Sequence, residues 1–222
     1  MNPILKRTLT GMTVAAAVIL AVLFAPVSWF RPVVFVLMLL AVWEFSSLLS
    51  RKCRPASVGF WAVLLVGAVV VFFGLGAIPL IAERFGNVML LCVLAIVKFS
   101  DTGGFAFGVT SSKLMKGGNH KLCPTISPNK SWEGLFGSVF ASCVMSCAWI
   151  PFTRFGVGRA LAFGVTAALV GTFGDLVESK FKRWVGVKDS ATFMPAGLGG
   201  LLDMFDSLLF APAVLRAFLI GL

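Results

Sequence analysis

The sequence carries little charge, a single histidine and no tyrosine. Charged residues make up 13% of its 222 residues, and His120 is the only histidine. The five cysteines are an odd number and none are in a Cys-x-x-Cys spacing, so they support neither a zinc site nor a disulfide framework. Soluble globular domains carry about 25% charged residues. The shortage of charge therefore argues against a soluble domain.

Long apolar runs take the place of the missing charge. Hydrophobic residues make up 59% of the chain, and the mean hydropathy is +0.98. A helix that crosses a bilayer needs about 20 apolar residues. We therefore predict an all-α, polytopic membrane bundle in which residues 1–222 form one membrane domain without a soluble part or long linker. The seven expected transmembrane helices are 9–29, 32–49, 57–82, 87–107, 132–151, 160–178 and 198–220.

The positive charges predict how the helices are oriented. Lys and Arg accumulate in the loops that stay cytoplasmic, and alternate loops of this chain hold thirteen and four of them. The richer set includes the N-terminus, which places that end in the cytoplasm and the C-terminus outside. We expect the first apolar run to be a retained span rather than a cleaved signal peptide, because it is long and lacks an Ala-x-Ala exit. The net charge of +10 favours anionic lipid headgroups over nucleic acid as a partner.

Most of the acidic residues fall in the predicted cytoplasmic halves of the later spans. Residues three apart share a helix face, so Asp175 with Glu178 and Asp203 with Asp206 form two carboxylate pairs, and Asp101 lies at a similar depth. Like charges near lipid are costly unless a cation lies between them. Carboxylate oxygens suit Mg²⁺, which usually binds one or two carboxylates and substrate phosphates. The alternative is a set of interfacial carboxylates paired with nearby lysines.

The neighbouring segments favour phosphate. In SPNKSWEG, residues 127–134, Ser127 is predicted as an N-cap with Pro128 in the first helical position, so that free N–H groups would face an anion. Lys130 lies in this segment, and SKFKRW, residues 179–184, adds further cations, which in the alternative reading only fix topology. Gly103 and Gly104 permit either close approach to a ligand or close packing of helices. Together these features predict phosphoryl or nucleotidyl transfer to a lipid phosphate.

Four ordered motifs resemble those of the phosphatidate cytidylyltransferase family, also called CDP-diglyceride synthetases. They are SDTGGFAFG (100–108), SPNKSWEG (127–134), GDLVESKFKR (174–183) and KDSATFMPAGLGGLLDMFDS (188–207). The resemblance covers about residues 98–212, which we expect to form the catalytic region, whereas residues 1–97 are spans with weak family signal. Two departures stand out: the segment after Pro195 is one residue longer and lacks the family's histidine, and Met204 stands where the family has arginine.

The resemblance implies transfer of the cytidylyl group of CTP to phosphatidate at the cytoplasmic face of a bacterial-type inner (plasma) membrane, with Mg²⁺ and room for a monovalent cation such as K⁺. Expected partners are CTP, phosphatidate and membrane lipids, and a homodimer is left open. The implied catalytic residues are Asp203, Asp206, Asp175, Lys188 and Asp189. The implied substrate-binding residues are Ser127, Lys130, Ser179, Lys182, Arg183, Gly199 and Gly200. The implied metal ligands are Asp203, Asp206, Asp175 and Asp101.

The same residues are compatible with three alternative functions. A CTP-dependent lipid kinase would use the same metal and phosphate groups but transfer the γ-phosphoryl group to an alcohol. A cation-coupled transporter would also place carboxylates in spans, although usually near the midplane and often with repeated halves. A non-catalytic homologue would leave the acids without a role.

Overall fold

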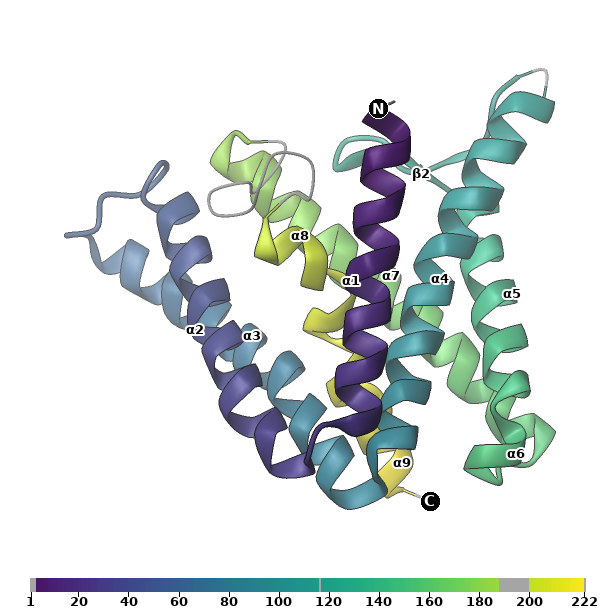
Figure 1. Ribbon diagram of the computed structural model, residues 1–222. Helices are drawn as coiled ribbons and strands as arrows, with labels where there is room; N and C mark the ends of the chain where they lie inside the picture. The colour runs from purple at the N-terminus through teal and green to yellow at the C-terminus, as the bar shows by residue number, and fades with distance from the viewer. Residues whose placement is uncertain (1–2, 116, 188–199, 222) are drawn as a thin grey trace.

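The computed structural model describes residues 3–115, 117–187 and 200–221 (Figure 1). Helices dominate the described residues, which also form one short two-stranded ribbon. In chain order the elements are α1 (Pro3–Phe24), η1 (Val27–Trp29), α2 (Phe30–Leu49), α3 (Val58–Phe85), α4 (Asn87–Leu114), β1 (Lys121–Cys123), β2 (Ser127–Ser131), α5 (Trp132–Ala148), α6 (Ile150–Thr153), α7 (Val157–Val185), α8 (Leu201–Phe205), η2 (Ser207–Leu209) and α9 (Ala211–Ile220).

The helices have the length and composition of a membrane protein. Among the described residues, four segments are long and apolar enough to cross a bilayer: η1 with α2, α3, α4 and α7. Three further apolar helices, in α1, α5 and α9, are shorter. Large apolar side chains cover the outside of the bundle, including Phe24, Phe105 and Phe136. The prediction of an all-α integral membrane protein is confirmed at this level, whereas the count of seven spans and the direction of insertion stay predictions.

Helix boundaries follow local signals in the sequence. Ser57 caps α3, because its hydroxyl accepts a hydrogen bond from the Phe60 N–H at 3.2 Å. Gly86 separates α3 from α4 at a φ of +86°, a conformation that favours glycine. At the end of α7, Gly186 takes the left-handed cap at a φ of +88°. These signals fix where the long helices stop and turn.

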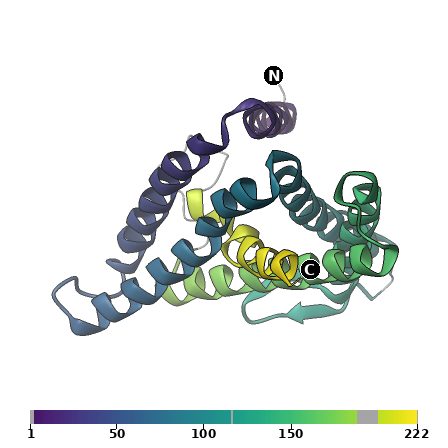
Figure 2. The ribbon, with the colours of Figure 1, turned by 90° about the horizontal axis from the view of Figure 1, so that it is seen from below.

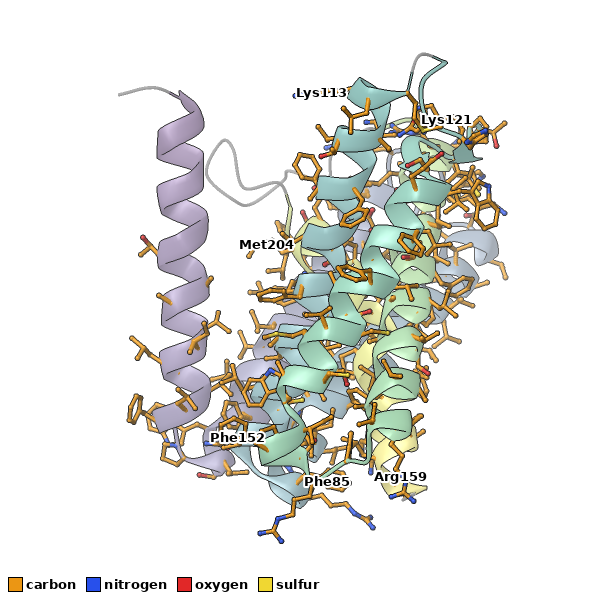
Figure 3. All side chains as sticks on the ribbon, turned by 90° about the vertical axis from the view of Figure 1, so that its right-hand side faces the viewer. Phe85, Lys113, Lys121, Phe152, Arg159 and Met204 are labelled. Atoms are coloured by element: carbon orange, nitrogen blue, oxygen red, sulfur yellow. The ribbon has the colours of Figure 1, made fainter. Side chains whose placement is uncertain are left out.

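The two sets of basic loops lie at opposite ends of the bundle. The N-terminus, the β1–β2 ribbon and α8 lie towards one end, and α6 and the C-terminus lie at the other (Figure 1). Lys113 and Lys121 mark the first end, and Arg159 marks the second (Figure 3). At the second end, Arg31 of α2 forms a two-pronged ion pair with Glu83 of α3, with Nη2 to Oε2 at 2.7 Å. Alternate loops therefore lie at opposite ends, as the order of the helices predicts, while the side of the membrane that each end faces stays a prediction.

Helix α9 lies inside the bundle, where α3, α4 and α7 contact it (Figure 2). Its Leu215 is completely buried, and α4 contributes Leu90, Val93 and Ile96 to the same core. In contrast, α1 stands at the edge and contacts α4, and Val22 is the one buried side chain among those described in α1. The core therefore joins the C-terminal segment to the middle spans.

The expected seventh span, 198–220, is not one continuous helix. In its described part, α8 ends at Phe205, a 3₁₀ turn follows at Ser207–Leu209, and α9 begins at Ala211. Pro212 lies in the first turn of α9, where a missing N–H is tolerated but a continuing helix would lose a hydrogen bond. The apolar composition correctly predicted helix in this region, but it contains no signal strong enough to show this break, and a membrane crossing here stays a prediction.

Glycines bring α4 and α5 into close contact. A Cβ atom on Gly103 would lie 2.4 Å from the Cβ of Ala141 and 2.6 Å from the Gly137 carbonyl oxygen. A Cβ atom on Gly104 would lie 2.3 Å from the hydroxyl of Ser138. These distances support the helix-packing interpretation of both glycines. Close approach of a ligand stays a prediction for Gly104, which also lines a pocket.

Candidate active site

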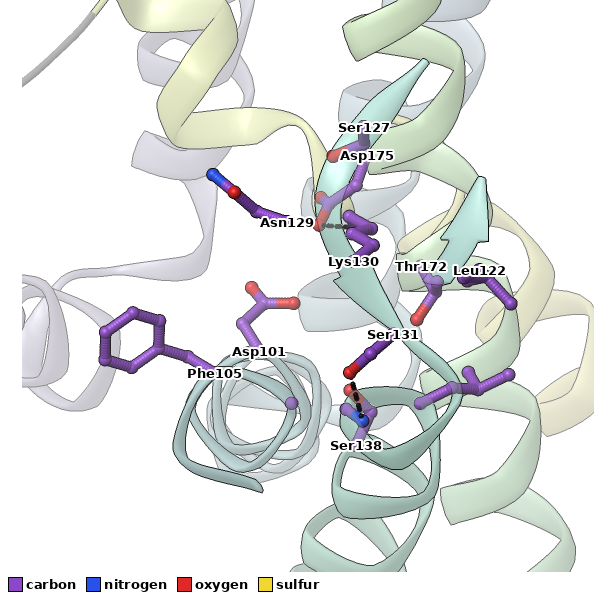
Figure 4. Close-up of a pocket in the computed structure, with 13 residues that line it drawn as sticks. Asp101, Phe105, Leu122, Ser127, Asn129, Lys130, Ser131, Ser138, Thr172 and Asp175 are labelled. Carbon is purple, nitrogen blue, oxygen red and sulfur yellow. Dashed lines mark hydrogen bonds and ion pairs between the residues drawn. The ribbon is translucent and has the colours of Figure 1, made fainter. Parts of the chain in front are cut away.

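A pocket of about 260 Å³ opens between α4, α5, α7 and the β2 strand (Figure 4). Its lining includes four residues that were predicted from the sequence to belong to the site: Asp101, Ser127, Lys130 and Asp175. Asn129, Phe105, Leu122 and Thr172 complete much of the wall. The volume is near the lower limit for small-molecule sites, which span about 300–1,000 Å³. Residues separated by more than 70 positions in the sequence therefore share one cavity.

The β1–β2 ribbon corrects the predicted role of Ser127. Residues 127–131 form an extended strand in which Cys123 pairs with Ser127 and Lys121 with Ser131. Extended geometry is favoured at Ser127 because it precedes a proline. The N-cap of α5 is instead Ser131, whose hydroxyl accepts a hydrogen bond from the Gly134 N–H at 3.0 Å. The expectation of a helix start with free N–H groups at Ser127 is therefore wrong.

The ribbon is anchored to α5 by His120 and Glu133. The backbone N–H of His120 donates to both carboxylate oxygens of Glu133 at 3.2 Å, and the His120 Nδ1 lies 2.7 Å from Oε1. The N–H of Trp132 donates to the His120 carbonyl at 3.0 Å. These bonds hold the strand that carries Lys130 against the pocket.

Three carboxylates from separate segments converge beside this pocket, and we name Asp101, Asp175 and Asp206 the aspartate cluster. The Asp175 carboxylate interacts electrostatically with those of Asp101 and Asp206. Lys130 forms an ion pair with Asp175, which lies beside it in the pocket wall (Figure 4). The Ser207 hydroxyl contacts Asp101 Oδ2 at 2.9 Å. Negative charge is thus concentrated where α4, α7 and the α8–η2 junction meet.

The aspartate cluster has the character of a cation site. The Oδ1 atom of Asp175 is buried and accepts no hydrogen bond from any residue that the structure describes. In the described ranges, no three acidic, histidine or cysteine side chains lie close enough to form a complete metal site. Mg²⁺ does not need such a cage, because it keeps several waters and binds one or two carboxylates together with substrate phosphates. Asp175 and Asp206 therefore supply carboxylates of the kind that Mg²⁺ uses, while binding of the ion stays a prediction.

Lys182 joins a second group of acids further along α7. Its Nζ lies 2.7 Å from Glu178 Oε2 and 2.6 Å from Asp203 Oδ1, and its side chain is only 12% exposed. Asp203 Oδ2 also accepts a hydrogen bond from the Gly200 N–H at 2.9 Å. Lys182 and Asp203 thus bind each other in this structure, while their roles towards phosphate and metal stay predictions.

The two predicted carboxylate pairs are divided between these groups. Helix α7 and the segment 200–206 run in opposite directions (Figure 1). The first acid of the pair on α7 therefore lies beside the second acid of the pair on the other segment, and the second lies beside the first. Asp175 interacts with Asp206, and Glu178 shares Lys182 with Asp203. The three-residue spacing correctly placed the two acids of each pair on one helix face. Only the tertiary structure shows which residue of the neighbouring segment each acid contacts.

The remaining predicted site residues lie outside the two acidic groups or outside the described part of the chain. Gly200 is the N-cap residue of α8, and Ser179 is half-buried on α7. Arg183 donates from Nη1 to the Val187 carbonyl at 3.2 Å. Lys188, Asp189, Pro195 and Gly199 lie outside the described residues.

Two charged residues near the site, in addition to the uncharged residues of the pocket wall, were not predicted from the sequence. Glu44 of α2 is 1% exposed, and its Oε2 accepts a hydrogen bond from the Leu202 N–H at 2.9 Å. Lys98 of α4 lies 3.1 Å from the Ser207 hydroxyl and 3.3 Å from Asp101 Oδ2. Both residues could have been found from the sequence, because each is a charged residue within an apolar span. Charged residues in such spans usually have a function.

Glu44 offers a test of how α8 is held. Glu44→Leu should lower the free energy of unfolding by about 1–3 kcal/mol, because the buried Leu202 N–H would lose its acceptor. Glu44→Gln retains a carbonyl oxygen and should lose less. Thermal unfolding in detergent measures both variants. Equal midpoints for the leucine and glutamine variants would contradict this role for Glu44.

Comparison with known proteins adds to this geometry. Residues 54–221 match the cytidylyltransferase family. The phosphatidate cytidylyltransferase of Staphylococcus aureus (strain COL) is 45% identical over 133 residues, which are 59% of this chain and 48% of that protein. The phosphatidate cytidylyltransferase of Staphylococcus haemolyticus (strain JCSC1435) is 40% identical over 154 residues, or 68% and 56% of the two chains. This chain spans about half the length of the curated relatives it matches.

The family match includes every described residue of the pocket, the aspartate cluster and the Lys182 group. It begins before α3, so it extends further towards the N-terminus than the motifs themselves. Glu44, which contacts α8, lies before it. The chain belongs to the cytidylyltransferase family.

Proposed function

We propose that this protein transfers the cytidylyl group of CTP to phosphatidate, giving CDP-diacylglycerol and pyrophosphate. The observation that carries the proposal is the aspartate cluster beside a pocket that also contains Lys130, within a membrane-embedded bundle. Family membership and the names of the relatives support the same reaction. Carboxylates for a metal and a lysine for phosphate are the parts that phosphoryl-type transfers require.

The residues of the pocket have distinct roles in this proposal. Lys130 faces the pocket and would bind a phosphate oxygen once the substrate competes with Asp175 for its ammonium group. The Ser127 and Ser131 hydroxyls on β2 line the same wall and can donate hydrogen bonds. A phosphatidate oxygen attacks the α-phosphorus of CTP, the bond from that phosphorus to the β-phosphate oxygen breaks, and pyrophosphate leaves with the electron pair.

Asp175 and Asp206 would hold Mg²⁺, with Asp101 beside them. A bound Mg²⁺ would neutralise the negative charge of the CTP phosphates. Support comes from the buried Asp175 oxygen that lacks a donor among the described residues. Asp203 would reach the same ion only after leaving Lys182, so we propose that its first role is to hold Lys182 and the start of α8.

The membrane location follows from the same proposal. The pocket lies towards the end of the bundle that carries Lys113 and Lys121, which the charge distribution assigns to the cytoplasm (Figure 3). CTP is water-soluble, whereas phosphatidate is held in the bilayer. We propose an inner (plasma) membrane enzyme whose site is reached by CTP from the cytoplasm and by phosphatidate from the lipid.

Transfer of label from CTP to lipid tests this function. The purified protein, in detergent micelles containing phosphatidate, should move label from the α-phosphorus of CTP into lipid with Mg²⁺, and lose this activity with a chelator. Parallel reactions with diacylglycerol and CTP labelled on the γ-phosphorus detect a lipid kinase instead. Label in lipid only in the γ reaction would overturn the proposal. A folded protein that transfers neither label would do the same.

A further inference from the structure

Lys98 places a positive charge on the apolar helix α4, next to the aspartate cluster. It lies on α4, one turn before Asp101, and its side chain is 47% exposed. Its ammonium group lies 3.1 Å from the Ser207 hydroxyl, 3.3 Å from Asp101 Oδ2 and 3.3 Å from the Met204 carbonyl oxygen. It also interacts electrostatically with Asp206.

These contacts use the full donor capacity of the side chain. A lysine ammonium group has three N–H donors and no acceptor, and Lys98 has three oxygen partners. Two of these partners belong to the segment 204–207 that joins α8 to η2. Lys98 therefore ties α4 to the point where the last apolar segment is broken. Such a lysine has little capacity left to bind a substrate phosphate directly.

The charge of Lys98 also balances the aspartate cluster. Lys130 pairs with Asp175, which leaves Asp101 and Asp206 on the other side with Lys98 as their basic neighbour among the described contacts. Position 204 itself contributes an uncharged Met side chain. The positive charge next to Asp101 and Asp206 is thus supplied by Lys98 of α4.

We propose that Lys98 is a positioning residue that holds the aspartate cluster together and acts as its internal counter-ion. The proposal rests on the proposed function, in which this cluster holds the divalent ion and the CTP phosphates meet it. Removal of the Lys98 charge would leave the cluster more negative, so a divalent cation would bind more tightly. The carboxylates would be held less firmly, so turnover would be slower.

The test compares Lys98→Met with Lys98→Arg in the full chain. Binding of Mn²⁺ alone is measured by electron paramagnetic resonance, and cytidylyl transfer is measured separately at saturating CTP. For Lys98→Met we expect Mn²⁺ binding at least about threefold tighter. We also expect kcat to fall by about tenfold, a smaller loss than for a group that contacts the reacting phosphates. Lys98→Arg keeps the charge and should stay near the original protein in Mn²⁺ affinity.

The outcomes separate this proposal from the function it rests on. Unchanged or weaker Mn²⁺ binding by folded Lys98→Met would overturn the counter-ion role, and a kcat within twofold of the original protein would overturn the positioning role. Should Lys98→Met fail to fold, Lys98→Gln, which retains a donor, undergoes the same two measurements. If the original protein transfers no label, the proposed function fails, while the Mn²⁺ comparison still decides the role of Lys98.

Discussion

Asp206→Asn should reduce cytidylyl transfer by at least about 100-fold, the usual loss when one charge-stabilising group is removed next to a reacting centre. Asp206 interacts with Asp175 where the proposed metal ion and CTP phosphates meet. Asparagine preserves the size of the side chain but removes its charge, so the site would hold a divalent ion weakly. Initial rates at several Mg²⁺ concentrations measure the effect, and part of the lost rate should return at high Mg²⁺.

Glu83→Gln is the matched control for this experiment. Glu83 is also an acid at a helix end, but it pairs with Arg31 at the opposite end of the bundle. Its side chain is partly exposed, and exposed ion pairs contribute little to stability. We therefore expect transfer within twofold of the original protein. Equal rates for Asp206→Asn and the original protein would remove the aspartate cluster from the proposed mechanism.

Gly74→Ala and Gly174→Ala should each displace the broken segment that carries Asp206, with a large loss of stability and transfer. A Cβ atom on Gly74 would lie 1.8 Å from the Leu209 carbonyl oxygen, and one on Gly174 would lie 2.5 Å from the Asp206 carbonyl oxygen. Both obstacles are backbone atoms, which cannot rotate away. Overpacking of this kind costs about 1–3 kcal/mol or more. Transfer should fall at least about tenfold for Gly174→Ala, which moves Asp206 directly.

Two glycines on the same helices serve as controls. At Gly59 of α3 and Gly158 of α7, a Cβ atom would meet no described atom within 4 Å other than those of the adjoining residues and of the helix's own backbone. Alanine is the better helix former by about 1 kcal/mol, so Gly59→Ala and Gly158→Ala should leave thermal unfolding in detergent unchanged or slightly higher. A similar loss for Gly158→Ala and Gly174→Ala would show that contact with the Asp206 backbone is not the cause.

Much of the architecture was accessible from the sequence because the bilayer imposes a strong constraint. Every backbone polar group in lipid must be satisfied within the protein, so long apolar runs become helices. Helices are found at all seven predicted positions, although the last is interrupted between Asp206 and Phe210. The separation of basic loops into two ends was also predictable, since it depends only on the order of the spans. The β1–β2 ribbon was missed, because its strands are short and polar and lack a clear period of two.

The candidate site was predictable in its chemistry but not in its pairings. Asp101, Lys130 and Asp175 stand out in sequence because charged groups in or beside apolar segments are costly without a partner. Which charges pair with one another depends on how far each segment is shifted along its antiparallel neighbour. Close contacts such as that of Gly174 with the Asp206 backbone set this shift. Glu44 and Lys98 belong to the site only because α2 and α4 pack beside the segment 200–207.

The sequence alone determined that this protein is a helical membrane protein, and it predicted which acids and bases would bind a metal and phosphate. Composition and spacing are local properties, and they specify helices and the faces of helices. Only the tertiary structure decided that Asp175 meets Asp206, that Asp203 binds Lys182 and that Ser127 lies in a strand. The physical reason is that these contacts join residues far apart in the chain, and their geometry is set by how closely the helices pack.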